Sequence, residues 1–201
     1  MGKYEWRLIV VLTVICVLSG GVLGWVNSLT APAIAEQEKL AKQRALQEAL
    51  PMATEFAAEP AILPELVSKD RTRVAEVYRA YSEDKPQGYV VIVEARGYAG
   101  PIRMAVGVTA EGNLAALAVI SQSETPGLGA EIKNKSFLTQ PAFRRAKVGT
   151  ELAVKKDRGE VDAVSSATIS SRAVVRGVNA ALTAAQVLLE RDQTSGGDHI
   201  D

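Results

Sequence analysis

An apolar run near the start of the chain places the strongest constraint on the fold. From Leu8 to Val26 the sequence reads LIVVLTVICVLSGGVLGWV, nineteen residues without a charge, and the next charged residue is Glu36. At about 1.5 Å per residue, a helix of this length crosses a hydrocarbon core of roughly 30 Å. The run therefore predicts a single transmembrane helix within residues 1–30.

A cleaved signal peptide is the alternative interpretation of this run. Lys3 and Arg7 could form its basic start, and Ala33-Ile34-Ala35 could form a small-residue cleavage site. The run exceeds the usual signal-peptide core of about 7–15 residues, which favours an uncleaved anchor. Because the charges before the run are basic and the first one after it is acidic, we expect a cytoplasmic N-terminus. In a bacterium, the C-terminal domain then lies on the periplasmic or outer side of the inner membrane.

The domain after the run has few residues that bind metals. The one cysteine, Cys16, lies inside the run after bulky Ile15, where it suits packing and not a lipoprotein signal, and the one histidine is His199 near the C-terminus. This excludes disulfides, iron–sulfur clusters, the usual zinc sites and an internally ligated haem from the domain. The 23 basic and 23 acidic residues balance, which argues against nucleic acid as a partner. Electron transfer would need an organic cofactor.

Residues 31–70 are predicted to connect the span to a folded domain. Ala33 to Leu50 consists of strong helix formers between Pro32 and Pro51, and we expect a spacer helix there with one apolar stripe. The proline-containing segment from Pro51 to Lys69 predicts an irregular connection.

The rest of the chain predicts one α+β domain over residues 71–193. Short turn-like segments separate the β-prone segments, so neighbouring strands are expected to be antiparallel. We expect a loop or short helix at Glu131–Arg145, a short strand at Leu152–Lys155, and a helix from Ser170 to about Arg191 covering one face of the sheet. Residues 194–201 predict a disordered tail. The four predicted strands are Val74–Tyr81, Tyr89–Ala95, Ile102–Val108 and Leu114–Ile120.

A row of hydroxyl groups precedes the predicted C-terminal helix. Residues 162–171 read DAVSSATISS, and Thr168 lies where the helix is expected to begin. Unpaired N–H groups and the positive end of the helix dipole favour a bound phosphate at such a position. For an isolated cluster of this kind, ordinary helix capping by serine and threonine is the simpler interpretation.

Two further glycine-containing clusters lie at the ends of predicted elements, where backbone can approach a ligand. They read RGYAGPI at 96–102 and SETPGLGAEI at 123–132. Each has a simpler interpretation, because Gly97 and Gly100 are compatible with a turn and Pro126-Gly127 with a β-turn.

Taken together and in this order, these features resemble a known family. The single span, the linker helix, GYAGPI, ETPGLG, AVKKD at 153–157 and the hydroxyl motif resemble the FMN-binding G subunit of the Rnf electron-transport complex. The C subunit of the sodium-pumping NADH:quinone reductase is a more distant resemblance. In this family the motif D-x-x-[ST]-G-A-T carries FMN through a phosphoester on its threonine. Asp162, Ser165, Ala167 and Thr168 match that motif, and Ser166 replaces its glycine.

The resemblance implies how the flavin is held. Thr168 is the attachment residue, and neighbouring hydroxyls and the helix N-terminus hold the phosphate. Arg172 is either a counter-ion or a solvated charge, while Lys155 and Lys156 either stabilise the reduced flavin or are solvated. The loop from Glu124 to Gly129 and the Tyr98 element line the ring, although Tyr98 could equally be a core aromatic. The other implied cofactor residues are Ser165, Ser166, Ala167, Ser170, Ser171, Asp162, Thr125, Gly127 and Leu128.

The resemblance also implies a function and partners. The chain is expected to be a non-catalytic electron carrier in a membrane complex that couples electron transfer between ferredoxin and NAD to Na⁺ or H⁺ movement. Its partners are the other membrane subunits, including a second flavin-bearing one, and a flavin transferase that installs FMN from FAD. Two alternatives remain: a membrane-tethered binding or assembly module without a cofactor, and an outward-facing flavin reductase.

Overall fold

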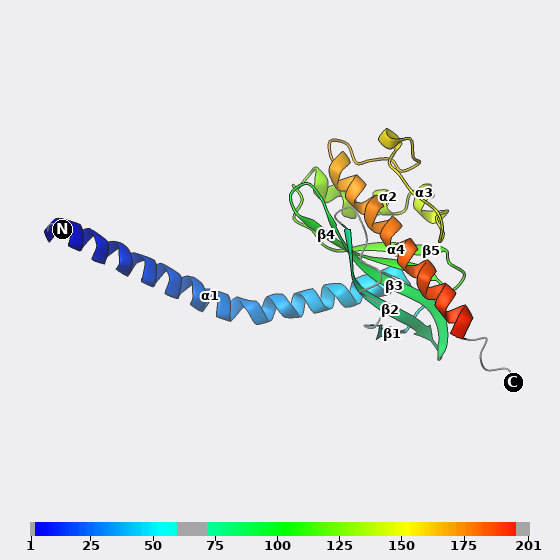
Figure 1. Ribbon diagram of the computed structural model, residues 1–201, viewed down its shortest axis with the longest axis horizontal. Helices are drawn as coiled ribbons and strands as arrows, with labels where there is room; N and C mark the ends of the chain where they lie inside the picture. Colours follow the sequence, from blue (N-terminus) through cyan, green and yellow to red (C-terminus); the bar gives the residue numbers. More distant parts are fainter. Residues whose placement is uncertain (1–2, 60–71, 196–201) are drawn as a thin grey trace. The chain divides into compact units, whose positions relative to one another are not determined.

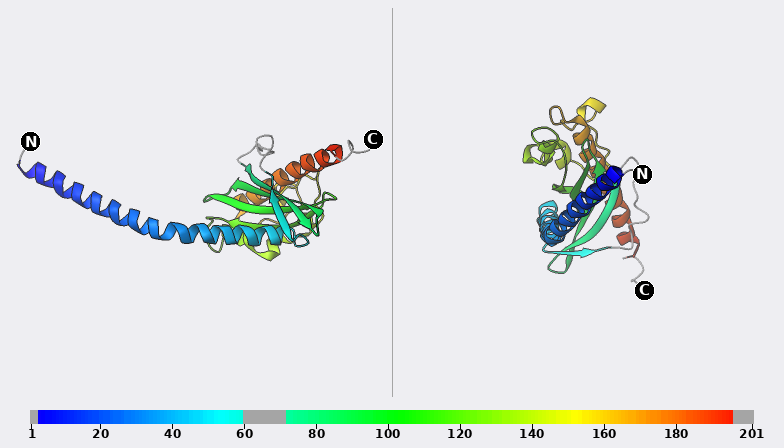
Figure 2. Two further views of the ribbon diagram at one scale, coloured as in Figure 1. Left: turned by 90° about the horizontal axis from the view of Figure 1, so that it is seen from below. Right: turned by 90° about the vertical axis from the view of Figure 1, so that its left-hand side faces the viewer.

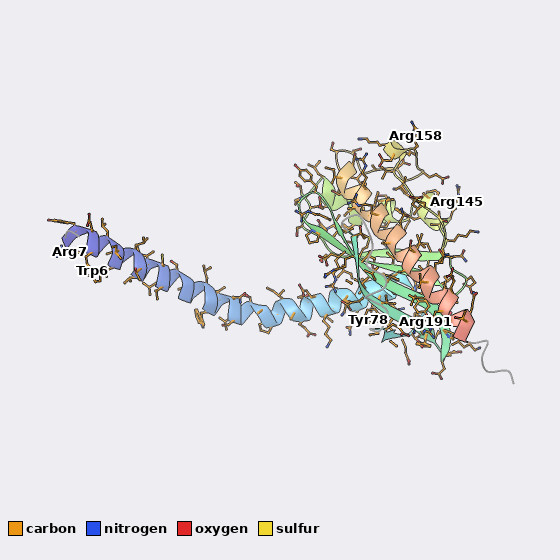
Figure 3. The ribbon with its side chains drawn as sticks, in the orientation of Figure 1. Trp6, Arg7, Tyr78, Arg145, Arg158 and Arg191 are labelled. Atoms are coloured by element: carbon orange, nitrogen blue, oxygen red, sulfur yellow. The ribbon has the colours of Figure 1, made fainter. Side chains whose placement is uncertain are left out.

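The computed structural model describes residues 3–59 and 72–195, and the chain divides into two compact units, Met1–Ala41 and Lys42–Asp201. Helix α1 runs from Lys3 to Ala49 and continues through Pro32, with Trp6 and Arg7 near its N-terminal end (Figure 3). By length and composition it can cross a membrane, since its most apolar 18-residue window has a mean hydropathy of 2.5 and its apolar side chains are exposed. The predicted span and the predicted spacer helix are thus parts of one helix.

Five strands of the second unit form one antiparallel sheet in the order β1-β2-β3-β4-β5 (Figure 1). All four predicted strands and their antiparallel pairing are confirmed. Glu83 and Asp84 join β2 to β3, and both have the positive φ that tight hairpins favour. The strand bounds are Glu55–Ala58 for β1, Thr72–Ser82 for β2, Lys85–Arg96 for β3, Pro101–Thr109 for β4 and Leu114–Ser121 for β5.

Two local expectations differ from the structure. Residues 55–58, expected to be irregular, form β1 because the edge of β2 supplies a hydrogen-bonding partner that local sequence does not reveal. The predicted strand at Leu152–Lys155 is reduced to one isolated bridge between Val154 and Val161. Four short helices follow β5: η2 at Gly129–Lys133, α2 at Lys135–Leu138, α3 at Pro141–Arg144 and η3 at Lys155–Asp157.

Helix α4 runs from Thr168 to Ser195 and so includes the first two residues of the predicted tail. The remaining tail residues, 196–201, lie outside the described residues. So does most of the predicted irregular connection, residues 60–71.

The sheet is covered on both faces, not on one as expected. Tyr89, Val91 and Val93 of β3 pack in a core with α4, whereas the alternate residues Val90 and Ile92 pack with the last turns of α1. Figure 2 shows these two helical segments on opposite sides of the sheet. The uninterrupted apolar sequence of β3 is explained by this double burial.

The C-terminal end of α4 is held to the sheet by a half-buried polar cluster. Tyr89 donates its hydroxyl proton to Asp192 Oδ2 at 2.6 Å, and Arg79 contacts both residues. Burial and the hydrogen bond to Asp192 raise the pKa of Tyr89. Because this cluster fixes one end of α4, it also helps to fix the position of the other end, where Thr168 lies.

Replacing Tyr89 with phenylalanine is expected to lower the free energy of unfolding by about 1–2 kcal/mol, because a hydrogen bond to a charged group is lost. The ring stays buried, so the loss comes from the hydroxyl alone. Thermal or denaturant unfolding of the full chain in detergent measures it, with Tyr81→Phe on the neighbouring strand as the control. An unchanged midpoint would show that Arg79 and Asp192 hold α4 without Tyr89.

A second polar cluster holds the end of α1 to the opposite face. Lys42 Nζ lies 3.1 Å from Glu76 Oε2, to which Tyr78 donates at 2.5 Å (Tyr78 is labelled in Figure 3). Burial alone would raise the pKa of Glu76. The hydrogen bonds from Tyr78 and Lys42 outweigh burial and lower it.

Candidate functional site

Thr168 is the first residue of α4, two residues earlier than the predicted helix start. Its side chain is half-buried, while those of Ser165 and Ser166 in the preceding turn are exposed. Within the described residues, the hydroxyls of Ser165 and Ser166 make no hydrogen bond to the protein. The first N–H groups of a helix have no intrahelical acceptor, so Thr168 lies in a group of donors suited to an anion.

The helix η3 docks beside Thr168. Lys156 Nζ donates to Thr168 Oγ1 at 2.9 Å. The next residue, Asp157, accepts two hydrogen bonds from Arg172, at 2.6 and 2.7 Å. These bonds hold the pKa of Asp157 below its usual range. Thr168 and Arg172 are four residues apart and share one face of α4, so the two contacts fix η3 against that face.

Asp162, the first residue of the motif, is held from two sides. Its carboxylate lies 2.7 Å from Lys155 Nζ. Its backbone pairs with the side chain of Gln140, which donates to Asp162 O at 2.9 Å and accepts from Asp162 N at 2.7 Å. Asp162 therefore orders the start of the loop that leads to Thr168.

Ser166 adopts a backbone conformation that glycine favours. Its φ is +60°, in the left-handed region, where side chains with a Cβ are strained. This is the position at which the family motif has glycine, so the structure gives the physical reason for that preference.

We expect Ser166→Gly to raise the free energy of unfolding by about 0.5–1 kcal/mol, since about 1–2 kcal/mol of strain is relieved and part of it is offset by a more flexible unfolded chain. Ser166→Val should lower the stability instead, because a β-branched residue fits positive φ poorly. Unfolding midpoints of the two variants measure these effects. Shifts of equal sign would contradict the strained conformation.

Ser170 and Ser171 are fully buried and bonded inside the domain. Ser171 Oγ accepts from Val164 N and donates to Ala167 O, both at 3.0 Å. Ser170 donates to Glu124 Oε2 at 2.7 Å. Their hydroxyls therefore stabilise the loop, with buried Ala167 packed beside them, and they are not presented to solvent.

Glu124 brings the three sequence clusters together. Its carboxylate, in a residue only 5% exposed, accepts from Tyr98 N at 2.9 Å, from Ala99 N at 3.1 Å and from the Ser170 hydroxyl. Gly97 and Gly129 leave room for it, because an added Cβ would lie 2.2 and 2.6 Å from its oxygens. One buried carboxylate thus joins the GYAG turn, the ETPGLG loop and the start of α4.

The ETPGLG loop forms the β-turn that its sequence predicts. Leu128 N donates to Thr125 O at 3.1 Å, and Gly127 takes the positive φ of +74° that the third position of such a turn requires. Ala130 N also donates to Thr125 O. In the described part of the chain, the N–H groups of Gly127 and Gly129 make no backbone hydrogen bond. Gly127 is exposed and can present its N–H to a ligand, whereas Gly129 is buried.

Three exposed apolar side chains come from the segments that Glu124 joins. Tyr98 is 73% exposed, Leu128 44% and Ile169 47%. The alternative that Tyr98 is a core aromatic is therefore wrong. Exposed apolar side chains on segments that are joined in this way are suited to pack against a flat ring.

Sequence reasoning missed the structural roles of three site residues. No sequence pattern indicated a role for Gln140, because its side chain bonds the backbone of Asp162 and not another side chain. Glu124 could have been suspected from the glycines around it, which make space for a buried group. Lys156 could not be distinguished from Lys155 without the fold. Among the residues that the structure describes, no cluster of His, Cys, Asp or Glu could hold a metal ion.

Two protein families match this chain. Residues 97–183 match the FMN-binding domain, a range that includes Tyr98, Glu124 and Thr168. Residues 9–49 match the RnfG N-terminal region, which corresponds to most of α1.

Similar proteins span most of the chain. The G subunit of the Na⁺-translocating ferredoxin:NAD⁺ oxidoreductase complex of Acetobacterium woodii is 32% identical, over 92% of this chain and 94% of that protein. The G subunit of the ion-translocating oxidoreductase complex of Pseudomonas aeruginosa is 36% identical, over 81% and 79%. The crystal structure of the C subunit of the Na⁺-translocating NADH-quinone reductase from Parabacteroides distasonis has a similar fold, with a TM-score of 0.56 and 18% identity over 79% of this chain and 96% of that one.

Proposed function

Because this chain belongs to the family of Rnf complex G subunits, we propose that it is an electron carrier with FMN esterified to Thr168. It works within a membrane complex that couples electron transfer between ferredoxin and NAD to the movement of Na⁺ or H⁺. FMN, when bound, supplies reversible electron transfer, and the chain holds it and does not turn over a substrate of its own.

The observation that carries this proposal is the environment of Thr168. Its hydroxyl is partly accessible at the start of a long helix, beside a lysine ammonium group and two exposed serine hydroxyls. This set of donors fits a phosphate diester, which has negative charge and several acceptor oxygens. The residues present therefore fit the phosphate of FMN.

The neighbouring segments fit the ring. Tyr98, Leu128 and Ile169 present apolar surface, and the N–H group of exposed Gly127 is a donor for a carbonyl oxygen on the ring edge. A Cβ at Gly127 would meet no atom within 4 Å, so the loop is open on that side. Glu124, Ser170 and Ser171 keep these segments in register and do not contact the flavin themselves.

Attachment requires a separate flavin transferase and a flavin adenine dinucleotide. Thr168 Oγ1 forms a bond to the phosphorus of the FMN half, the pyrophosphate P–O bond breaks, and AMP leaves. The hydroxyl proton passes to a base of the transferase, and no electrons are exchanged.

The proposed place of the chain is the cytoplasmic membrane. Helix α1 anchors it with the N-terminus in the cytoplasm, and the flavin-bearing domain lies on the periplasmic or outer side. The partners are the other proteins of the complex, including a second flavin-bearing membrane protein.

Production of the full chain with and without a flavin transferase tests the proposal. We expect flavin fluorescence to remain with the denatured chain on a gel only when the transferase is present, because the bond is covalent. A non-fluorescent chain beside a labelled reference substrate would support the cofactor-free assembly module instead.

A further inference from the structure

Helix η3 and the first turns of α4 carry three cations, and two of them pair with carboxylates. Lys155 pairs with Asp162, and Arg172 pairs with Asp157 through two hydrogen bonds. Lys156 has no carboxylate partner among the residues that the structure describes, and it donates to the Thr168 hydroxyl instead. The uncompensated positive charge of the cluster therefore lies at the atom that accepts the phosphate.

The position of Lys156 is fixed by its neighbours. The helix η3 is held at both ends, because Lys155 N donates to Val161 O at 2.8 Å and Gly159 N donates to Val154 O at 3.1 Å. The Asp157–Arg172 pair then fixes η3 to α4 one turn beyond Thr168. The Lys156 side chain is exposed. Its backbone is nevertheless fixed, in a position from which the side chain reaches Thr168.

On the basis of the function proposed above, we propose that Lys156 is the positioning residue of the attachment site. Before attachment, its ammonium group donates to Thr168 Oγ1 and leaves the hydroxyl proton free to pass to the base of the transferase. After attachment, the same group pairs with the negative charge of the phosphodiester. Arg172 serves to hold η3 and is not the counter-ion.

A comparison of two exposed cations of one segment tests this role, Lys156 in η3 and Arg158 directly after it. Full-length wild type, Lys156→Met and Arg158→Met are incubated in detergent with FAD and an active flavin transferase, and attachment is followed over time by intact mass. We expect Lys156→Met to react about tenfold more slowly, the effect of losing one charge-assisted hydrogen bond, and Arg158→Met to stay within about twofold of wild type. Lys156→Arg should recover most of the rate.

The phosphorus NMR resonance of the attached diester gives a readout that does not depend on the transferase. We expect it to shift in fully modified Lys156→Met and to stay in place in Arg158→Met. Unfolding midpoints show that the variants are folded, and Lys156→Gln replaces the methionine variant if that one is unstable.

The outcomes separate the two proposals. A wild-type chain that stays unmodified by a transferase active on its reference substrate overturns the proposed function. A modified wild type, with Lys156→Met and Arg158→Met equal in rate and in phosphorus resonance, leaves the function in place and overturns the role of Lys156.

Discussion

Replacing Thr168 with valine is expected to abolish covalent flavin attachment while the fold is retained. Valine has nearly the same shape and β-branching, but it lacks the oxygen that bonds to phosphorus. The hydrogen bond lost with Lys156 is exposed, so the free energy of unfolding should change by less than about 1 kcal/mol. Flavin fluorescence of the denatured chain and its unfolding midpoint measure the two effects separately.

Thr183→Val is the matched control for this prediction, because Thr183 is an exposed threonine of the same helix and lies outside the motif. Its attachment should stay close to that of wild type. A Thr168→Val variant that keeps its covalent flavin would show that the attachment residue has been assigned to the wrong hydroxyl.

Replacing Glu124 with alanine is expected to lower the free energy of unfolding by about 2–4 kcal/mol, because three donors lose their acceptor, one of them the buried Ser170 hydroxyl, and a cavity is left. The donors are Tyr98 N, Ala99 N and the Ser170 hydroxyl. The GYAG turn would then be released from α4. Hydrogen exchange of the Tyr98 and Ala99 amides, together with unfolding midpoints, measures both consequences.

Two variants show which property of Glu124 matters. Glu124→Gln keeps the shape and one acceptor oxygen, and its amide can donate to the Ser170 hydroxyl, so its loss should be about 1–2 kcal/mol. Glu160→Ala removes an exposed carboxylate and should change stability by less than about 0.5 kcal/mol. Equal effects of Glu124→Ala and Glu160→Ala would mean that the buried carboxylate does not hold the three segments together.

Much of the fold was predictable because it depends on local patterns. The apolar run in β3 and the turns on either side of it predict strands, and the spacing of apolar residues after Ser170 predicts α4. Strand β1 and the packing of the end of α1 depend on long-range contacts. Ala-rich segments such as 55–58 carry no local signal for such contacts.

The candidate site was predictable as a set of segments but not as a set of roles. The three clusters were identified from their glycines and hydroxyls, and the structure joins them through Glu124. The roles of individual residues depend on pairing. Lys155, Lys156 and Arg172 cannot be distinguished by sequence alone. The fold shows that Lys155 pairs with Asp162 and Arg172 with Asp157.

The measurement that tests the central claim most directly is peptide mapping by tandem mass spectrometry of the full chain produced with a flavin transferase. We predict that the peptide containing Thr168 carries the added mass of FMN less one water, with fragment ions placing it on Thr168. That mass on any other residue, or an unmodified peptide while the transferase labels its reference substrate, would contradict the account.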